Sequence, residues 1–142
     1  MYRHDYIIRL IERFGAALRT LRDVILQRQR EGPLVRAEIG EIARHAGLDL
    51  TVARTLDAHT LLMWLAPGGE PDPAKLWLMA ELLYLEGLEA RASGGAEWRG
   101  DMTRAMALLD TLEPDWRPGD AFTPAAERVA EIRTLLAAPP EE

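Results

Sequence analysis

Cysteine is absent from this chain of 142 residues. That absence excludes disulfide bridges, thiolate zinc sites and cysteine nucleophiles. Uninterrupted apolar runs of about 18 residues, which a membrane span requires, are absent too. The densest stretch, at 76–88, is broken by Glu81, Glu86 and Gly87. Charged residues also stand at the start of the chain, where a secretory signal needs its hydrophobic segment. We therefore expect a cytoplasmic protein with no membrane span.

Lysine is nearly absent, because Lys75 is the single lysine among seventeen basic residues. Charge is also distributed unevenly along the chain. Residues 1–30 contain seven arginines and three carboxylates, a net charge of +4, whereas 31–142 contain ten basic and twenty acidic residues, a net charge of −10. Phosphate binding needs a basic surface. The acidic body therefore makes nucleic acid an unlikely partner.

Leucine and alanine are abundant, and apolar residues make up 48% of the chain. The longest helical pattern covers 5–31 and ends at Gly32-Pro33, which predicts one long amphipathic helix. Its apolar positions are Tyr6, Ile7, Leu10, Ile11, Phe14, Leu18, Leu21, Val24 and Ile25. Further helices are expected at 35–46, 50–65, 73–92, 97–113 and 123–137. The sequence thus predicts an all-α fold of about six helices in one domain, 1–138, followed by a frayed tail at 139–142.

Residues 73–114 are expected to form a helical hairpin around the Gly94-Gly95 turn. Leu83, Gly87, Ala90, Met102, Met106, Leu109 and Pro114 follow the order of a tetratricopeptide repeat. In that repeat a small residue on the first helix lets the second helix approach closely. The spacing departs from the repeat, so a generic antiparallel helical hairpin is the alternative. The apolar run from Leu61 to Leu65 is interpreted as buried.

The segment 39–56 has the pattern of a helix-turn-helix, with Gly47 at the turn. Thr51, Arg54 and Thr55 would then be the residues that reach DNA bases. The interval after Gly47 is one residue short for that motif, and Asp57 follows. Two ordinary packed helices joined by a glycine turn explain the segment equally simply.

The first helix is expected to bind a protein partner or a second copy of the chain. The candidate partner-binding residues are Arg13, Leu21, Arg22, Ile25 and Arg28. Its arginines have an alternative use, since they could pair with the acidic body of the same chain or contact an anionic membrane surface.

Catalytic signals are sparse. The three histidines, His4, His45 and His59, are expected on different elements, although Glu41 and His45 stand at helical spacing. Glu81, Glu86 and Glu89 on an apolar helix are expected to form ion pairs with Arg91 or with an arginine of the first helix. Ser93 has no neighbouring base. We therefore expect no catalytic residues, no cofactor and no metal.

The opening run from Met1 to Glu12, with Asp5-Tyr6-Ile7 followed by Arg9 and Ile11-Glu12, resembles an uncharacterised family of small bacterial helical proteins. Ala130-Glu131-Ile132 is similar too. The resemblance implies a tetratricopeptide-like helical fold, and it implies no catalytic residues. The leading hypothesis is a non-enzymatic helical interaction module, an adaptor or a peripheral subunit of a larger assembly. The alternative is a helix-turn-helix DNA-binding regulator that uses residues 39–56.

Overall fold

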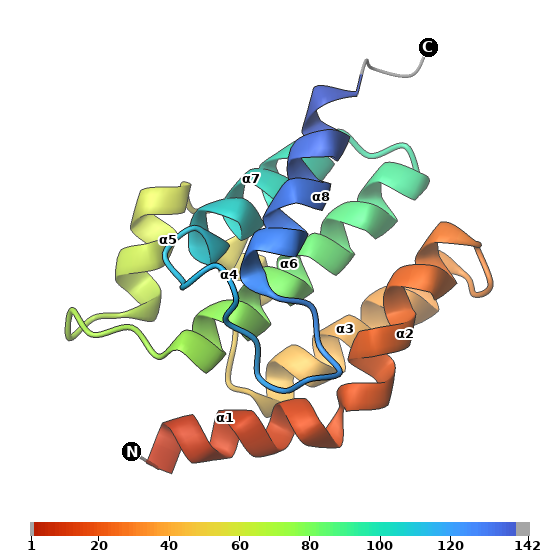
Figure 1. Ribbon diagram of the computed structural model, residues 1–142. Coiled ribbons are helices and arrows are strands. Elements are labelled where there is room, and N and C mark those ends of the chain that lie inside the picture. The colour runs from red at the N-terminus through yellow and green to blue at the C-terminus, as the bar shows by residue number, and fades with distance from the viewer. Residues whose placement is uncertain (1, 139–142) are drawn as a thin grey trace.

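The computed structural model describes residues 2–138, which form an all-helical fold with no strand (Figure 1). The eight described helices are α1 (Tyr2–Arg13), α2 (Gly15–Leu26), α3 (Gly32–His45), α4 (Leu50–Ala53), α5 (Ala58–Leu65), α6 (Pro73–Ala92), α7 (Trp98–Leu109) and α8 (Ala125–Ala137). The all-α class is therefore confirmed, but the expected count of about six helices is not. The predicted tail at 139–142 lies outside the described residues.

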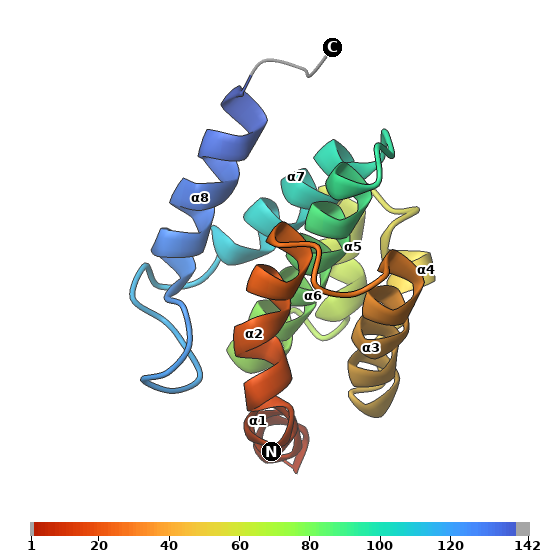
Figure 2. The same cartoon turned by 90° about the vertical axis from the view of Figure 1, so that its right-hand side faces the viewer.

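The predicted long helix over 5–31 is wrong, because the chain turns at Phe14 and α2 ends at Leu26. Phe14 has φ −95° and ψ 14°, outside helical geometry, and α1 and α2 leave it in different directions (Figures 1 and 2). A Cβ on Gly15 would lie 3.3 Å from the ring of Phe122, so glycine permits this close approach. Both helices still contact α6, which explains why the apolar pattern continues across the corner.

The predicted helix over 50–65 is also divided, into α4 and α5. The Asp57 carboxylate accepts a hydrogen bond from the backbone N–H of Thr60 at 2.7 Å, and this caps α5. Aspartate satisfies the free N–H groups at a helix start better than it fits a helix interior. Asp57 therefore begins a new helix instead of continuing the earlier one.

Helix α6 is the centre of the fold, and its boundaries agree with the prediction. Asp72 caps it by accepting from the N–H of Ala74 at 3.0 Å, and Pro73 occupies its first turn. Every residue from Leu76 to Ala90 is buried. A helix that is apolar on all sides has to be surrounded by other elements, and α1, α2, α3 and α7 all contact it.

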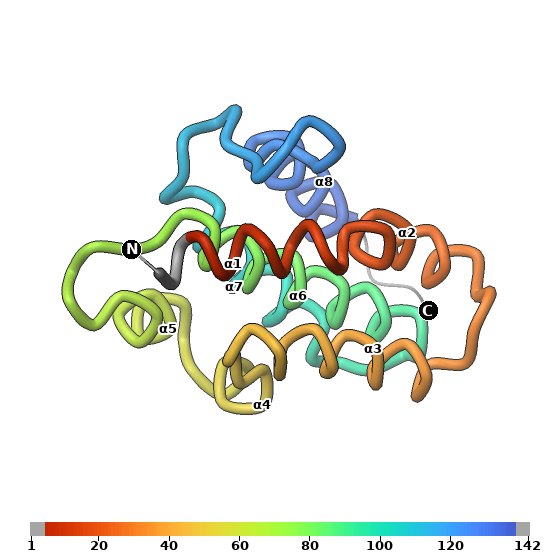
Figure 3. The backbone as a smooth tube through the Cα atoms, turned by 90° about the horizontal axis from the view of Figure 1, so that it is seen from below, coloured from red at the N-terminus to blue at the C-terminus, as the bar shows by residue number. Residues whose placement is uncertain are grey.

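The other helices are arranged around α6. Figures 2 and 3 place α8 on one side of α2 and α3 on the other. Helix α8 packs on α7 and begins at Ala125, two residues after the predicted cap Thr123. Thr123 has a different role, since its carbonyl accepts a hydrogen bond from the indole N–H of Trp77 at 3.1 Å.

Helices α6 and α7 form a tight antiparallel hairpin (Figure 1). Gly94, with φ +79°, ends α6, and the N–H of Gly95 donates to the carbonyl of Ala90 at 2.8 Å. A Cβ on Gly87 would lie 3.1 Å from the Met102 side chain and 3.2 Å from Asp101 Cβ. The absence of a side chain at Gly87 therefore lets the two helices approach closely, as the sequence predicted for this position.

Most of the predicted core residues of this hairpin are buried. Leu76, Met79, Leu83 and Leu109 are almost completely inaccessible, whereas Met106 is partly buried. We expect Leu83→Ala to lower the free energy of unfolding by about 2–5 kcal/mol, through lost apolar burial and the remaining cavity. A denaturant titration measures this change. A loss under about 0.5 kcal/mol, the range of surface substitutions, would contradict the central position of α6.

Candidate functional site

Two of the predicted partner-binding residues are core residues in the structure. Leu21 is 0% exposed and Ile25 is 3% exposed, and both belong to the main hydrophobic cluster. The prediction that they form a docking edge or a dimer interface is therefore wrong. Because the chain turns at Phe14, α2 packs along α6 instead of projecting from the body.

The three predicted arginines have different surroundings. Arg22 donates through Nε to the Tyr84 hydroxyl at 2.9 Å and to Glu131 at 2.8 Å. Arg28 donates to the carbonyl of Ala92 at the end of α6, at 3.0 Å. Arg13 is exposed and stacks 5.4 Å from the Phe14 ring. Arg22 and Arg28 thus hold the fold together, and Arg13 alone of the five candidates lies free of such a tie on the surface described here.

Arg22 belongs to a polar network between α2, α6 and α8. Arg128 forms two hydrogen bonds with the buried Glu81 carboxylate, at 2.7 and 3.1 Å, and a third with Glu131 at 2.6 Å. Burial opposes the charge of Arg128, but Glu81 raises its pKa above the usual value. Burial likewise opposes the charge of Glu131, yet hydrogen bonds from Tyr84 and the two arginines lower its pKa. The network is fully paired and therefore structural.

The three α6 carboxylates are paired, but not with Arg91 or an arginine of the first helix, as the sequence analysis expected. Glu81 pairs with Arg128, Glu86 with Arg54 at 3.2 Å, and Glu89 with Arg36 at 3.5 Å. The cations come from α8, from the residue after α4 and from α3. Acid-base chemistry needs a carboxylate without such a partner, and these three do not supply it.

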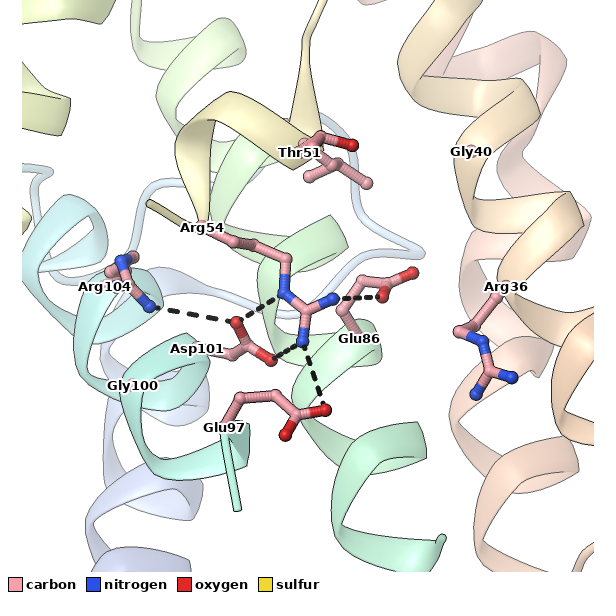
Figure 4. Close-up of a pocket in the computed structure, with 10 residues that line it drawn as sticks. Arg36, Gly40, Thr51, Arg54, Glu86, Glu97, Gly100, Asp101 and Arg104 are labelled. Atoms are coloured by element: carbon pink, nitrogen blue, oxygen red, sulfur yellow. Dashed lines mark hydrogen bonds and ion pairs between the residues drawn. The ribbon is translucent and has the colours of Figure 1, made fainter. Parts of the chain in front are cut away.

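Arg54, a predicted DNA contact, points into the protein (Figure 4). Its guanidinium makes two hydrogen bonds to Asp101 of α7, at 2.9 and 2.8 Å, in addition to the contact with Glu86. Such bidentate pairing occupies the face that would read a base. Helix α4, the proposed reading helix, is also only four residues long. The geometry of 39–56 therefore gives no support to DNA binding.

A groove of about 690 Å³ lies between the start of α1, the end of α3 and the end of α5. Tyr6, His45 and Trp64 bring aromatic rings to its lining, together with the 66–72 loop. The Tyr6 hydroxyl donates to the carbonyl of His45 at 2.7 Å, which holds α1 against the end of α3. The His45 ring lies 5.4 Å from the Phe14 ring. The groove thus has a fixed aromatic wall.

Large apolar side chains remain exposed beside this groove. Tyr6 is 51% exposed, Trp64 is 42% exposed, and Met63 on α5 is 61% exposed. The sequence analysis interpreted the run from Leu61 to Leu65 as buried, and this is wrong for Met63 and Trp64. Helix α5 covers the body with Leu61 and Leu65 only, so its next positions face outward. The composition of this run was the available signal for the site, but its direction depended on the tertiary packing.

The polar groups of the groove carry both charges. Arg44 pairs with Glu41, and His45 lies 3.1 Å from the same carboxylate. Lys75, Glu70 and Asp72 stand at the opposite end. No group of three metal-ligating side chains occurs within the described residues, so the Glu41–His45 pair has no third ligand there. The arrangement is suited to apolar contact surrounded by polar groups.

Comparisons with protein-family models, curated proteins and solved structures found no match to this chain. The resemblance of the opening residues to a bacterial helical family therefore stays a prediction. None of the helices in the described part is long and apolar enough to cross a membrane. The functional argument rests on the residues of the chain itself.

Proposed function

We propose that this protein is a non-enzymatic helical interaction module that binds a segment of a partner protein in the groove between α1 and α5. The observation that supports the proposal is the exposure of Tyr6, Met63 and Trp64 beside a groove of about 690 Å³. Tryptophan and tyrosine are the residues that most often dominate binding energy in protein interfaces. In this acidic, largely apolar-cored chain they stand outside the core.

The expected partner segment has one or two apolar anchor side chains with polar residues on both sides. The anchors would lie against Tyr6 and Trp64, and the flanking groups would face the charged ends of the groove at Arg44 and Lys75. Such a segment follows the usual anatomy of an interface, an apolar centre with a polar rim. Within this proposal α6 and α7 act as a tetratricopeptide-like supporting hairpin, and the module works in the cytoplasm.

Site-specific crosslinking identifies the partner. A photoreactive phenylalanine analogue replaces Trp64 and is activated in a lysate of the organism that encodes the chain. We expect a discrete crosslinked protein that is then purified and titrated against the intact chain. The same analogue at Leu34, which is 58% exposed and does not line the groove, is the matched control.

Trp64→Ala should weaken the purified complex by about 30-fold, since truncating an interface hot spot costs about 2 kcal/mol. The side chain is partly exposed, so the variant should keep its thermal stability. Calorimetric titration measures the affinity, with Leu34→Ala as the control that binds normally. Equal affinity of wild type and Trp64→Ala would exclude the groove as the binding site.

A further inference from the structure

A second cavity, of about 540 Å³, lies where α3, α4, α6 and α7 meet (Figure 4). Pockets of this size hold small molecules. Its charged lining contains three arginines and three carboxylates: Arg36, Arg54, Arg104, Glu86, Glu97 and Asp101. The cavity does not overlap the groove between α1 and α5, since the two share no lining residue.

Part of this charge is already neutralised inside the protein. Asp101, whose side chain is 1% exposed, accepts both of its close hydrogen bonds from Arg54. Arg104 donates to the carbonyl of Leu56 at 2.5 Å and lies 3.9 Å from Asp101. These three residues form the fixed floor of the cavity and are not available to a ligand.

The remaining charges lie on opposite walls. On α3, Arg36 is half exposed, and its one ion pair, with Glu89, is 3.5 Å long. A charge-assisted hydrogen bond is normally about 2.7–2.9 Å long, so Arg36 is only loosely held. On the other wall, Glu97 is exposed and lies 3.9 Å from Arg54. The cavity thus offers a cationic group facing an anionic wall.

Glu86 provides the strongest sign of a ligand. Its side chain is 8% exposed, and one carboxylate oxygen accepts from Arg54 at 3.2 Å. The other oxygen accepts no hydrogen bond from the described residues, and Figure 4 shows it directed away from Arg54, toward the Arg36 side of the cavity. Burial raises the pKa of Glu86, although Arg54 and Arg36 oppose the shift. A cation at this oxygen would compensate for the lost hydration.

We propose that this cavity binds a small zwitterion, a molecule with an ammonium group and a carboxylate separated by a few bonds. The ammonium group lies between Glu86 and Glu97, and the carboxylate pairs with Arg36. An ion of one sign would leave the opposite wall unpaired, which costs binding free energy. Phosphate would meet repulsion from Glu86 and Glu97.

Probes with fixed charge separation test this assignment. Glycine, β-alanine and 4-aminobutyrate carry both charges at increasing distances, whereas butylamine and butyrate carry one charge each. The backbone amides of Gly40 and Gly100, which line the cavity, report binding in ¹H–¹⁵N NMR titrations. We expect at least one zwitterion to cause saturable shifts at both glycines and to bind at least about tenfold more tightly than either single-charge probe, a difference of one decade in Kd.

Two variants separate the walls. Arg36→Gln should reduce the affinity of the best zwitterion to that of butylamine, and Glu97→Gln should weaken the zwitterion and butylamine in parallel. Arg30→Gln is the matched control, because Arg30 pairs with Glu38 and does not line the cavity. Unaltered glycine amides with every probe, or butylamine binding as tightly as the zwitterions, would overturn the proposal. So would normal zwitterion binding by Arg36→Gln.

Discussion

Arg128→Ala should lower the free energy of unfolding by about 3–5 kcal/mol, the range for a buried ion pair that loses one partner. Arg128 is 6% exposed and Glu81 is 2% exposed, so the substitution leaves a carboxylate in the core without a cation. It also removes the guanidinium that stacks 4.1 Å from the Tyr84 ring and bonds Glu131. Chemical denaturation followed by far-UV circular dichroism measures the loss.

Arg133→Ala provides the matched control for this experiment. Arg133 lies on the same helix but is exposed, so its removal should change stability by less than about 0.5 kcal/mol. Arg128→Met combined with Glu81→Leu should recover most of the loss, because apolar residues of similar size replace buried ion pairs well. A double variant as unstable as Arg128→Ala would show that the network does more than compensate the Glu81 charge.

Leu21→Asp should unfold the protein. Replacing a buried leucine by alanine already costs about 2–5 kcal/mol, and Leu21 is fully inaccessible between α2 and the rest of the core. Aspartate adds the cost of placing a carboxylate where no cation is available. Since a domain has about 5–15 kcal/mol of stability in total, we expect loss of the cooperative thermal transition.

Thr20→Asp is the neighbouring control, because Thr20 is exposed on the same helix. It should keep the transition and the molecular mass of the wild type. Light scattering gives the second measurement. A Leu21→Asp protein that stays folded but has half the mass of the wild type would restore the interface that the structure excludes.

The sequence by itself determined the features that depend on neighbouring residues. A composition rich in leucine and alanine with helical periodicity predicted the all-α class. Asp72-Pro73 and Gly94 predicted the ends of α6, because caps satisfy the backbone groups of their own helix. The buried positions Leu76, Met79 and Leu83 followed for the same reason, since a continuous apolar run can only be buried.

The tertiary structure decided the features that depend on distant residues. The corner at Phe14 keeps the apolar pattern of a straight helix, and the direction of α2 is fixed by its packing on α6. Whether Trp64 is core or surface depended on how much of α5 the body covers.

Asp101, which the sequence analysis did not single out, shows the same limit. It is the partner of Arg54, 47 positions away in the chain. Their pairing requires α7 to lie beside the end of α4, and no local pattern encodes that contact. Apolar periodicity specifies which face of a helix is buried, whereas the partner of a buried charge is known only when the helices have been placed.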